Sequence, residues 1–237
     1  SVIVVAEDGT AVIPALGGHK GANDLSLKLA DFLEIKASIT TASDLHYNVA
    51  LDAPPAQFYL ANTNDYKSFM KNLLSGEKVS LDGYLPWLKN TGIPASRDGK
   101  LKIRNTHRNE IGNQFELIYN SESLAVGVGC ERGTSVNELI SLVQTTLENN
   151  NFAKESIAVF VSIEQKMDEI AINAIADFFN KPLRFFDSVT LEEETPRLKN
   201  PSEIVFREVG SHGVAEASAL AAVGPHGELI VEKTKSR

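Results

Sequence analysis

The hydrophobic and polar positions of this chain alternate regularly near its N-terminus. A β-branched run, Val2–Ala6, has the composition of a buried parallel strand, and residues 11–16 form a second short apolar run. After a glycine-rich loop, apolar residues recur at the spacing of one helical face: Ala22, Leu25, Leu29, Phe32 and Leu33. Residues 36–41 again have the composition of a strand. Strand, loop, helix and strand in this order are typical of a parallel α/β sheet.

The same alternation returns near residue 122 and continues toward the C-terminus. A strand over residues 124–128 leads into a second glycine-rich loop, and Ser135 with Glu138 has the spacing of a capping box at a helix start. Further periodic runs predict helices over residues 167–179 and 214–223, and strands over residues 157–163, 183–186, 205–209 and 229–232. We therefore expect a complete α/β unit here.

The pattern between these two parts is weaker. Leu51-Asp52-Ala53-Pro54-Pro55 interrupts it, and only residues 65–74 have clear helical spacing. We expect an α/β protein with two Rossmann-like parallel-sheet domains joined by a less regular middle segment. Residues 1–50 would form a partial N-terminal domain, residues 51–121 the middle region and residues 122–237 the C-terminal domain.

Composition narrows the classes of protein that this chain can be. With 237 residues, 43% of them hydrophobic, it can bury one large or two modest cores. No run approaches the ~18 apolar residues of a membrane-spanning helix, and the net charge of −8 argues against nucleic acid as a partner. Cys130 is the only cysteine, and no basic and apolar leader segment opens the chain. We therefore expect a cytoplasmic protein without disulfides or a membrane partner.

One stretch of this acidic chain is basic. Five basic residues stand there against two acidic ones, Asp98 and Glu110: Arg97, Lys100, Lys102, Arg104 and Arg108. Such a run can be a solvated strand edge that charge keeps from pairing. It can also be a lip that attracts a carboxylate-rich ligand.

The first glycine loop, with Gly17, Gly18 and Gly21, joins a strand to a helix and can direct backbone N–H groups at an anion. His19 lies between these glycines at the helix start, where the dipole would hold it neutral, as a general base requires. The alternative is a loop histidine that bonds a nearby carbonyl.

Polar residues near this loop have two interpretations each. Asn23 can cap the helix or contact a substrate. Thr40, Thr41 and Asp44 lie at the C-terminal end of a predicted strand, where open α/β sheets bind their ligands. Asp44 can also cap the next segment.

The second glycine loop contains Gly129 and Gly133 and is one residue too long for a dinucleotide fingerprint. Cys130 in this loop is either a thiol with a lowered pKa or a small packing residue. Lys166 and Glu169, at a strand-to-helix junction, contact a ligand or belong to a solvated first helical turn. Glu216 lies early in an apolar helix, where its charge favours the helix dipole. The five histidines lack metal-ligand spacing, so no metal site is expected.

Taken together, these segments resemble a known family. Leu16-Gly17-Gly18-His19-x-Gly21-Ala22-Asn23-Asp24-Leu25 and Ile39-Thr40-Thr41-Ala42-Ser43-Asp44 resemble the N-terminal part of the cobalamin-biosynthesis family CbiG. Its C-terminal, CobE-type domain is similar to Gly127–Thr134, Lys166-x-Asp168-Glu169 and Val214–Leu220. The resemblance covers nearly the whole chain, weakly in residues 51–120.

The resemblance implies a cobalt-precorrin-5A hydrolase of anaerobic vitamin B12 synthesis. This activity opens the δ-lactone of a cobalt corrinoid and releases acetaldehyde, giving cobalt-precorrin-5B. His19 would be the base, with Asn23 beside it. Cobalt would arrive within the substrate, so no protein cofactor is needed. The substrate would contact Gly17, Gly18, Gly21, Thr40, Thr41, Asp44, Gly129, Cys130, Arg132, Gly133, Thr134, Lys166, Glu169 and Glu216.

Two departures from the family pattern stand out. Glu131 occupies a position where the family usually has a basic residue, although Arg132 follows it. Family members also carry further sequence ahead of Val2, so we expect part of the N-terminal domain to be missing.

Two alternatives to the hydrolase remain open. The chain can be a non-catalytic corrinoid-binding or carrier module that passes intermediates to other enzymes of the pathway. A Rossmann-like nucleotide binder is a third reading, and a homodimer is one alternative for its assembly.

Overall fold

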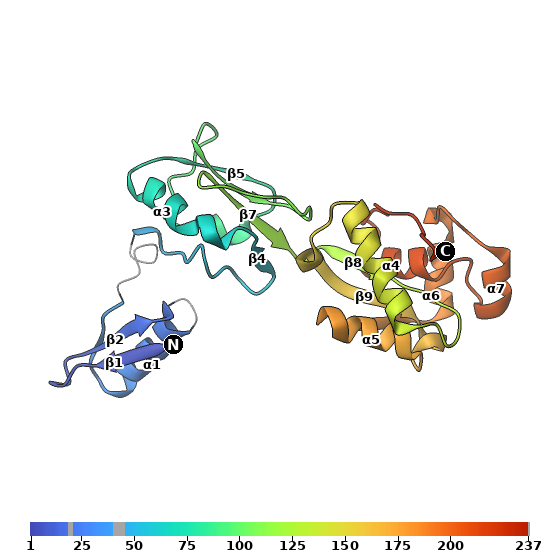
Figure 1. Cartoon of the computed structure of the whole chain (residues 1–237), viewed down its shortest axis with the longest axis horizontal. Helices are drawn as coiled ribbons and strands as arrows, with labels where there is room; N and C mark the ends of the chain where they lie inside the picture. The colour runs from blue at the N-terminus through green and yellow to red at the C-terminus, as the bar shows by residue number, and fades with distance from the viewer. Residues whose placement is uncertain (19–20, 40–45, 237) are drawn as a thin grey trace. The chain divides into compact units, whose positions relative to one another are not determined.

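The computed structural model describes residues 1–18, 21–39 and 46–236 (Figure 1). The chain is an α/β protein with three small sheets. It divides into two compact units, one of Ser1–Thr106 with Glu110–Asn120 and the other of His107–Asn109 with Ser121–Arg237. Among the described residues, no helix is both long and apolar enough to cross a membrane.

The first sheet contains β1 (Val2–Val5), β2 (Ala11–Leu16) and β3 (Lys36–Ala37) in the order β1-β2-β3. β1 runs antiparallel to β2, and β2 runs parallel to β3. The short turn after β1 accounts for this, because so short a connection can only join antiparallel neighbours. The prediction of a parallel N-terminal sheet is therefore wrong: the sheet is mixed.

Helix α1 (Ala22–Phe32) buries a different face from the expected one. Leu25 and Phe32, expected inside, are 48% and 82% exposed. The helix begins after Gly21, whose left-handed φ of 89° suits glycine, so the interpretation of Asn23 as the helix cap is wrong. The buried residues are smaller and share one face of the helix: Ala22, Asn23, Ser26 and Ala30.

The middle of the chain is more regular than expected. β4 (Phe58–Leu60), β5 (Val79–Asp82), β6 (Leu101–Asn105) and β7 (Glu116–Ser121) form one sheet in the order β4-β7-β6-β5. β5, β6 and β7 are parallel. Together with α3 (Tyr66–Leu74), the sheet encloses its own apolar core. The prediction of a less regular middle segment is wrong, because these strands are short and β6 alternates buried with charged residues.

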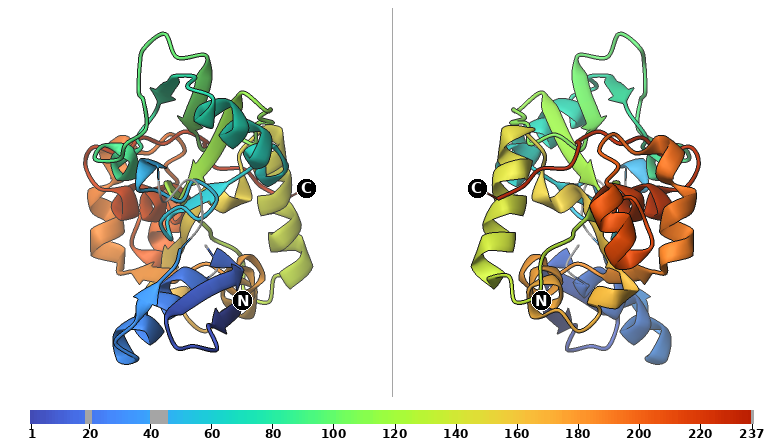
Figure 2. Two further views of the ribbon diagram at one scale, coloured as in Figure 1. Left: turned by 90° about the vertical axis from the view of Figure 1, so that its left-hand side faces the viewer. Right: turned by 90° about the vertical axis from the view of Figure 1, so that its right-hand side faces the viewer.

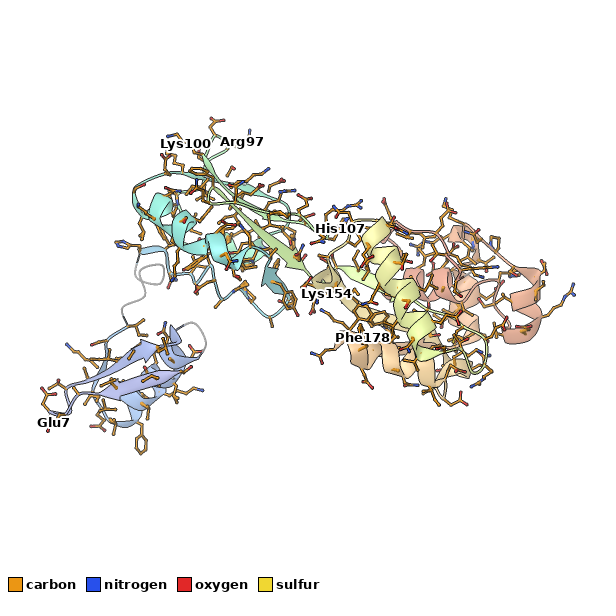
Figure 3. All side chains as sticks on the ribbon, in the orientation of Figure 1. Glu7, Arg97, Lys100, His107, Lys154 and Phe178 are labelled. Atoms are coloured by element: carbon orange, nitrogen blue, oxygen red, sulfur yellow. The ribbon has the colours of Figure 1, made fainter. Side chains whose placement is uncertain are left out.

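The basic stretch, residues 97–108, includes β6 and the loops on either side of it. Most of its cations pair with acids. Arg97 and Lys100 project from the loop before β6 (Figure 3). Lys100 pairs with Glu77 at 2.9 Å, and Arg104 pairs with Glu110 and, at 3.2 Å, with Glu116. Arg108 donates to the Asn150 carbonyl. The interpretation of this stretch as a strand edge that charge keeps from pairing is nevertheless wrong, because β6 pairs with β5 on one side and with β7 on the other.

The third sheet contains β8 (Leu124–Gly127), β9 (Ile157–Ile163) and β10 (Leu183–Phe186), all parallel, in the order β10-β9-β8. Helices α4 (Val136–Asn149) and α5 (Ile170–Phe179) pack against each other over one face. Helix α8 (Ala215–Val223) packs against β8 and β9. Figure 2 shows α4, in yellow, and α8, in red, on either side of the sheet.

Side chains of β9 alternate between two cores because successive residues of a strand point to opposite faces. Phe160 packs with α4 and α5, whereas Val161 and Ile163 pack with α8 and with α6 (Ser188–Glu193). The prediction of a parallel α/β unit in this part is confirmed.

Two predicted strands of this unit are wrong. Residues 203–209 form helix α7 (Glu203–Val209), which begins at the Ser202 side-chain cap and ends at the left-handed Gly210. Residues 229–232 join no strand among the described residues. They belong instead to an extended tail whose Lys233 N–H binds the Glu216 carboxylate at 2.8 Å.

Candidate functional site

Three loops meet near the carboxyl ends of β8 and β9: residues 128–135, residues 164–169 and residues 210–214. Parallel strands end at one edge of a sheet, which is where open α/β sheets bind ligands. Gly127 allows α8 to begin against this edge, because a Cβ atom there would lie 1.8 Å from the Ala215 carbonyl oxygen. Ser162 Oγ fastens the first loop by donating to the Val128 carbonyl at 2.8 Å.

Arg132 connects the loops. Its Nη1 lies 2.5 Å from Asp168 Oδ1, and its Nη2 donates to the Gln165 carbonyl at 2.6 Å. The Gln165 side chain in turn donates to the Val209 carbonyl at the end of α7, at 3.3 Å. The loops of residues 128–135 and 164–169 are thus held together by the contacts of the Arg132 side chain.

Glu169 is the buried member of this cluster, at 5% exposure. Its Oε1 accepts the Gly133 N–H at 3.2 Å, and its Oε2 lies 3.7 Å from Arg132 Nη1. Asn173 fixes the turn before α5 by donating to the Met167 and Glu169 carbonyls, each at 2.9 Å. The carboxylate therefore holds the tip of the glycine loop and a cation at once.

Cys130 is half-buried beside this cluster and packs against the core under α4 and α5. Burial raises the pKa of the Cys130 thiol, as does the charge of Glu169, although a hydrogen bond with Thr134 and the charges of Lys166 and Arg132 oppose this. A raised pKa keeps the thiol protonated, which favours the packing interpretation over a nucleophile.

The Glu216 carboxylate is 4% exposed, and the chain itself occupies it. It accepts hydrogen bonds from Lys199 N at 2.8 Å, Asn200 N at 3.0 Å, Asn200 Nδ2 at 2.8 Å and Lys233 N at 2.8 Å. Burial raises the pKa of Glu216, but these hydrogen bonds outweigh it and hold the pKa below its ordinary value. In this arrangement the carboxylate joins two segments to α8.

The N-terminal candidates are placed only in part. Gly17 accepts the Ala22 N–H at 3.1 Å, and Gly21 accepts the Leu25 N–H at 3.0 Å, so both shape the start of α1. Gly18 lies between them and Asn23 is buried on the inner face of the helix. Four further candidates lie outside the described residues, and their roles stay predictions: His19, Thr40, Thr41 and Asp44.

His212 is a further candidate site residue, a titratable side chain between two carboxylates, which the sequence alone did not indicate. Its Nδ1 lies 2.9 Å from Glu192 Oε1, its Nε2 lies 3.4 Å from Glu203, and its ring stacks on Phe206 at 4.5 Å. The hydrogen bond with Glu192 raises the pKa of His212. The one signal was its place in Gly210-Ser211-His212-Gly213, a third glycine loop before a helix. Within the described part of the chain, no group of three or more His, Cys, Asp or Glu residues could hold a metal ion.

Comparisons with known proteins give consistent results. A family model described as "Cobalamin synthesis G N-terminal" matches residues 1–44, and one described as "Cobalamin synthesis G C-terminus" matches residues 124–237. Protein CobE of Sinorhizobium sp is 43% identical over 113 residues, which are 48% of this chain and 73% of that protein.

Two further relatives align with almost all of the chain. The protein named cobalt-precorrin-5A hydrolase in Priestia megaterium is 26% identical, and the alignment covers 98% of this chain and 68% of that protein. A solved structure of a cobalamin biosynthesis protein G homologue from Sulfolobus solfataricus is 24% identical, with a TM-score of 0.41, and covers 97% of this chain and 68% of that one.

Proposed function

Because this chain belongs to the CbiG family of cobalamin biosynthesis, we propose that it is a cobalt-precorrin-5A hydrolase. The observation that carries the proposal is the length of the alignment with a protein of that name. It extends over nearly the whole chain and so includes both glycine loops. A fragment that shared only a binding domain would align over one part alone.

The proposed reaction consumes one water. The water oxygen adds to the lactone carbonyl, the acyl–oxygen bond breaks, and a carboxylic acid and an alcohol result. The alcohol carbon, which bears a methyl group, then leaves as acetaldehyde. The electron pair of the broken carbon–carbon bond stays with the macrocycle, which takes up the hydroxyl proton, so no oxidant or reductant is needed.

The loops supply chemistry that suits this substrate. The corrinoid carries acetate and propionate groups, which an arginine fork and backbone N–H groups bind well. We assign carboxylate recognition to Arg132 and to the backbone of Gly129, Gly133 and Thr134, with Lys166 as a second cation. Glu169 acts through Arg132 and Gly133 by positioning them.

Catalysis is assigned to the first glycine loop. His19 would remove a proton from the attacking water, because a neutral imidazole is a base near neutral pH. N–H groups at the start of α1 and the side chain of Asn23 would stabilise the oxyanion. Gly17, Gly18 and Gly21 would let the substrate approach the backbone, and Thr40, Thr41 and Asp44 would line the same site.

We also propose that the chain acts as three parts. These are a partial N-terminal domain over residues 1–50, a middle region over residues 51–121 and a C-terminal domain over residues 122–237. The separate apolar cores of the middle sheet and of the C-terminal sheet support this division.

The test is the product. The 237-residue chain is incubated with cobalt-precorrin-5A, and acetaldehyde is measured with a coupled alcohol dehydrogenase. We expect acetaldehyde in proportion to substrate consumed, and His19→Ala should abolish it while substrate binding persists. Absence of acetaldehyde from folded chain that binds the substrate would reject the proposal.

A second candidate function is a non-catalytic corrinoid carrier. It is favoured by the similarity to CobE, which aligns with only about half of this chain, and by the raised pKa of Cys130. A carrier would bind the corrinoid tightly and leave it unchanged, so the same incubation distinguishes the two functions.

A further inference from the structure

The contact between Arg132 and Asp168 is exposed, although Arg132 lies in the proposed carboxylate site. The two side chains are 57% and 76% exposed. Asp168 reaches a single nitrogen of the guanidinium, Nη1, at 2.5 Å. Exposed ion pairs of this kind contribute little to folding, because water and salt compete with them.

Other contacts hold Arg132 without the help of Asp168. The Gln165 carbonyl accepts from Nη2 at 2.6 Å, and the buried Glu169 lies 3.7 Å from Nη1. Glu169 is fixed in turn by the Gly133 N–H. The guanidinium therefore keeps its position if Asp168 swings away into solvent.

The geometry points to Asp168 as an internal stand-in for a ligand carboxylate, which occupies Arg132 until a carboxylate of the corrinoid displaces it. The inference rests on the proposed function in one respect, that the ligand is a corrinoid with ionised carboxylates. It makes Asp168 a residue that sets affinity and specificity. A ligand displaces Asp168 only if its own carboxylate binds Arg132 more strongly than Asp168 does.

The chemistry of the two groups supports competition. A carboxylate on a mobile, exposed side chain and a carboxylate on a ligand present the same acceptor atoms to the same N–H groups. A ligand with several carboxylates gains from the surrounding cations as well, and Lys166 lies close enough to influence the same cluster. Neutral or esterified ligands gain nothing from displacing Asp168.

A structural role is the alternative. Asp168 immediately precedes Glu169, the N-cap of α5, so its charge also favours the positive end of that helix. Such a role predicts that removal of the charge changes stability and leaves ligand affinity unaltered. The two roles are therefore separable by measuring both quantities.

The experiment compares three variants of the 237-residue chain: Asp168→Asn, Arg132→Gln and, as the matched control, Asp177→Asn. Asp177 is an exposed acid of α5, on the order of 12 Å further along the helix. The Asp177→Asn substitution removes the same charge without touching Arg132.

The probes are cobyrinic acid, which has free carboxylates, and its heptamethyl ester, which has the same macrocycle without them. Dissociation constants come from calorimetric titration, and thermal melting checks that each variant is folded.

We expect Asp168→Asn to bind cobyrinic acid about two- to fivefold more tightly than the unaltered chain. Arg132→Gln should bind it about tenfold more weakly, and Asp177→Asn should match the unaltered chain. The ester should show no difference among the variants.

The inference is overturned if Asp168→Asn binds the acid no more tightly than Asp177→Asn, or if the ester responds equally. It is also overturned if the unaltered chain does not bind the acid. The acetaldehyde assay stands apart from these outcomes. Tighter binding by Asp168→Asn without acetaldehyde release would leave this inference intact and reject the hydrolase.

Discussion

At the scale of single residues, Glu216 shows how a charge can be buried in an apolar helix. A buried carboxylate is tolerated when each lone pair meets a donor, and four donors reach this one. The donors come from residues 199–200 and 233, which lie far from α8 in sequence. The residue therefore matters to folding whatever it does for a ligand.

Replacing Glu216 by Gln should lower the free energy of unfolding by about 2–3 kcal/mol at neutral pH. An amide keeps one acceptor oxygen and turns its own N–H groups toward the remaining donors. Urea unfolding measures the difference, and Glu228→Gln, at an exposed position, is the control.

Because the pKa of Glu216 is lowered in the folded chain, this stabilisation is present above the pKa of the unfolded chain and is lost as pH falls through the pKa of the folded chain. An equal loss at neutral and strongly acidic pH would contradict this.

His212 should make stability depend on pH in the opposite sense. Its pKa is raised by Glu192 first and by Glu203, which face it from α6 and α7. Its contribution is therefore complete below the unfolded pKa near 6.5 and is lost as pH rises through the folded value. His212→Gln should flatten the pH dependence of the melting temperature between about pH 6 and 8. A profile unchanged by this substitution would show that the pair contributes nothing.

Arg132, Gly133 and Glu169 lie together in the structure because they follow neighbouring parallel strands, whose ends must meet, and this proximity could be predicted from the sequence. The pairing of His212 with Glu192 could not be predicted, because twenty positions, including the whole of α7, separate them and no periodicity relates the two. The sequence also could not tell that Glu216 points toward the chain and away from solvent. Both failures concern partners that only packing brings together.

At the scale of elements, the contact between β8 and α8 depends on one missing side chain. A Cβ at Gly127 would overlap the backbone of Ala215, and backbone cannot move as a flexible side chain can. A Cβ at Gly129, in contrast, would meet the Val214 side chain at 3.3 Å. The two glycines therefore differ in what a substitution would displace.

Gly127→Ala should lower the free energy of unfolding by about 2–3 kcal/mol, since α8 must shift away from the sheet. Gly129→Ala, the matched control, should cost about 1 kcal/mol or less. Denaturant unfolding of both variants measures the contrast. Equal losses would mean that α8 is not held against Gly127.

Helix α7 shows why a short apolar run misleads. Ile204-Val205-Phe206 is β-branched and aromatic, which favours a strand in isolation. The stronger signals were its ends: Ser202 caps the helix and Gly210 terminates it. For a run this short, the flanking residues decide the structure.

At the scale of the whole molecule, the described tail after α8 connects distant parts of its unit. Val231 packs on the core beneath α4, Lys233 binds Glu216, and Ser236 Oγ donates to Glu138 at 2.5 Å. The tail therefore contacts both α8 and α4 and links the two helices.

Removing residues 231–237 should cost about 2–4 kcal/mol of unfolding free energy, from lost burial and from an unmet buried carboxylate. Combined with Glu216→Gln, the loss should be smaller than the sum of the two, because both remove the Lys233 contact. Strict additivity in urea unfolding would show that tail and carboxylate act independently.

The α/β class and the C-terminal sheet were predictable because their apolar runs are long and regular. The middle sheet was not. In β6, the buried Leu101 and Ile103 alternate with Lys102 and Arg104, whose charges dominate the local composition. In the first sheet, the direction of β1 depended on the length of a turn, which strand composition does not report.

The alternation of β9 between two cores has a consequence for local opening. Helices α4 and α5 can separate from one face while α6 and α8 remain on the other, since each face has its own apolar cluster. An amide of β9 then exchanges with deuterium only when both faces open together, so its exchange is slow. The strand becomes the last part of its unit to lose protection, and the loops at its carboxyl end can rearrange around a ligand while the strand itself stays closed.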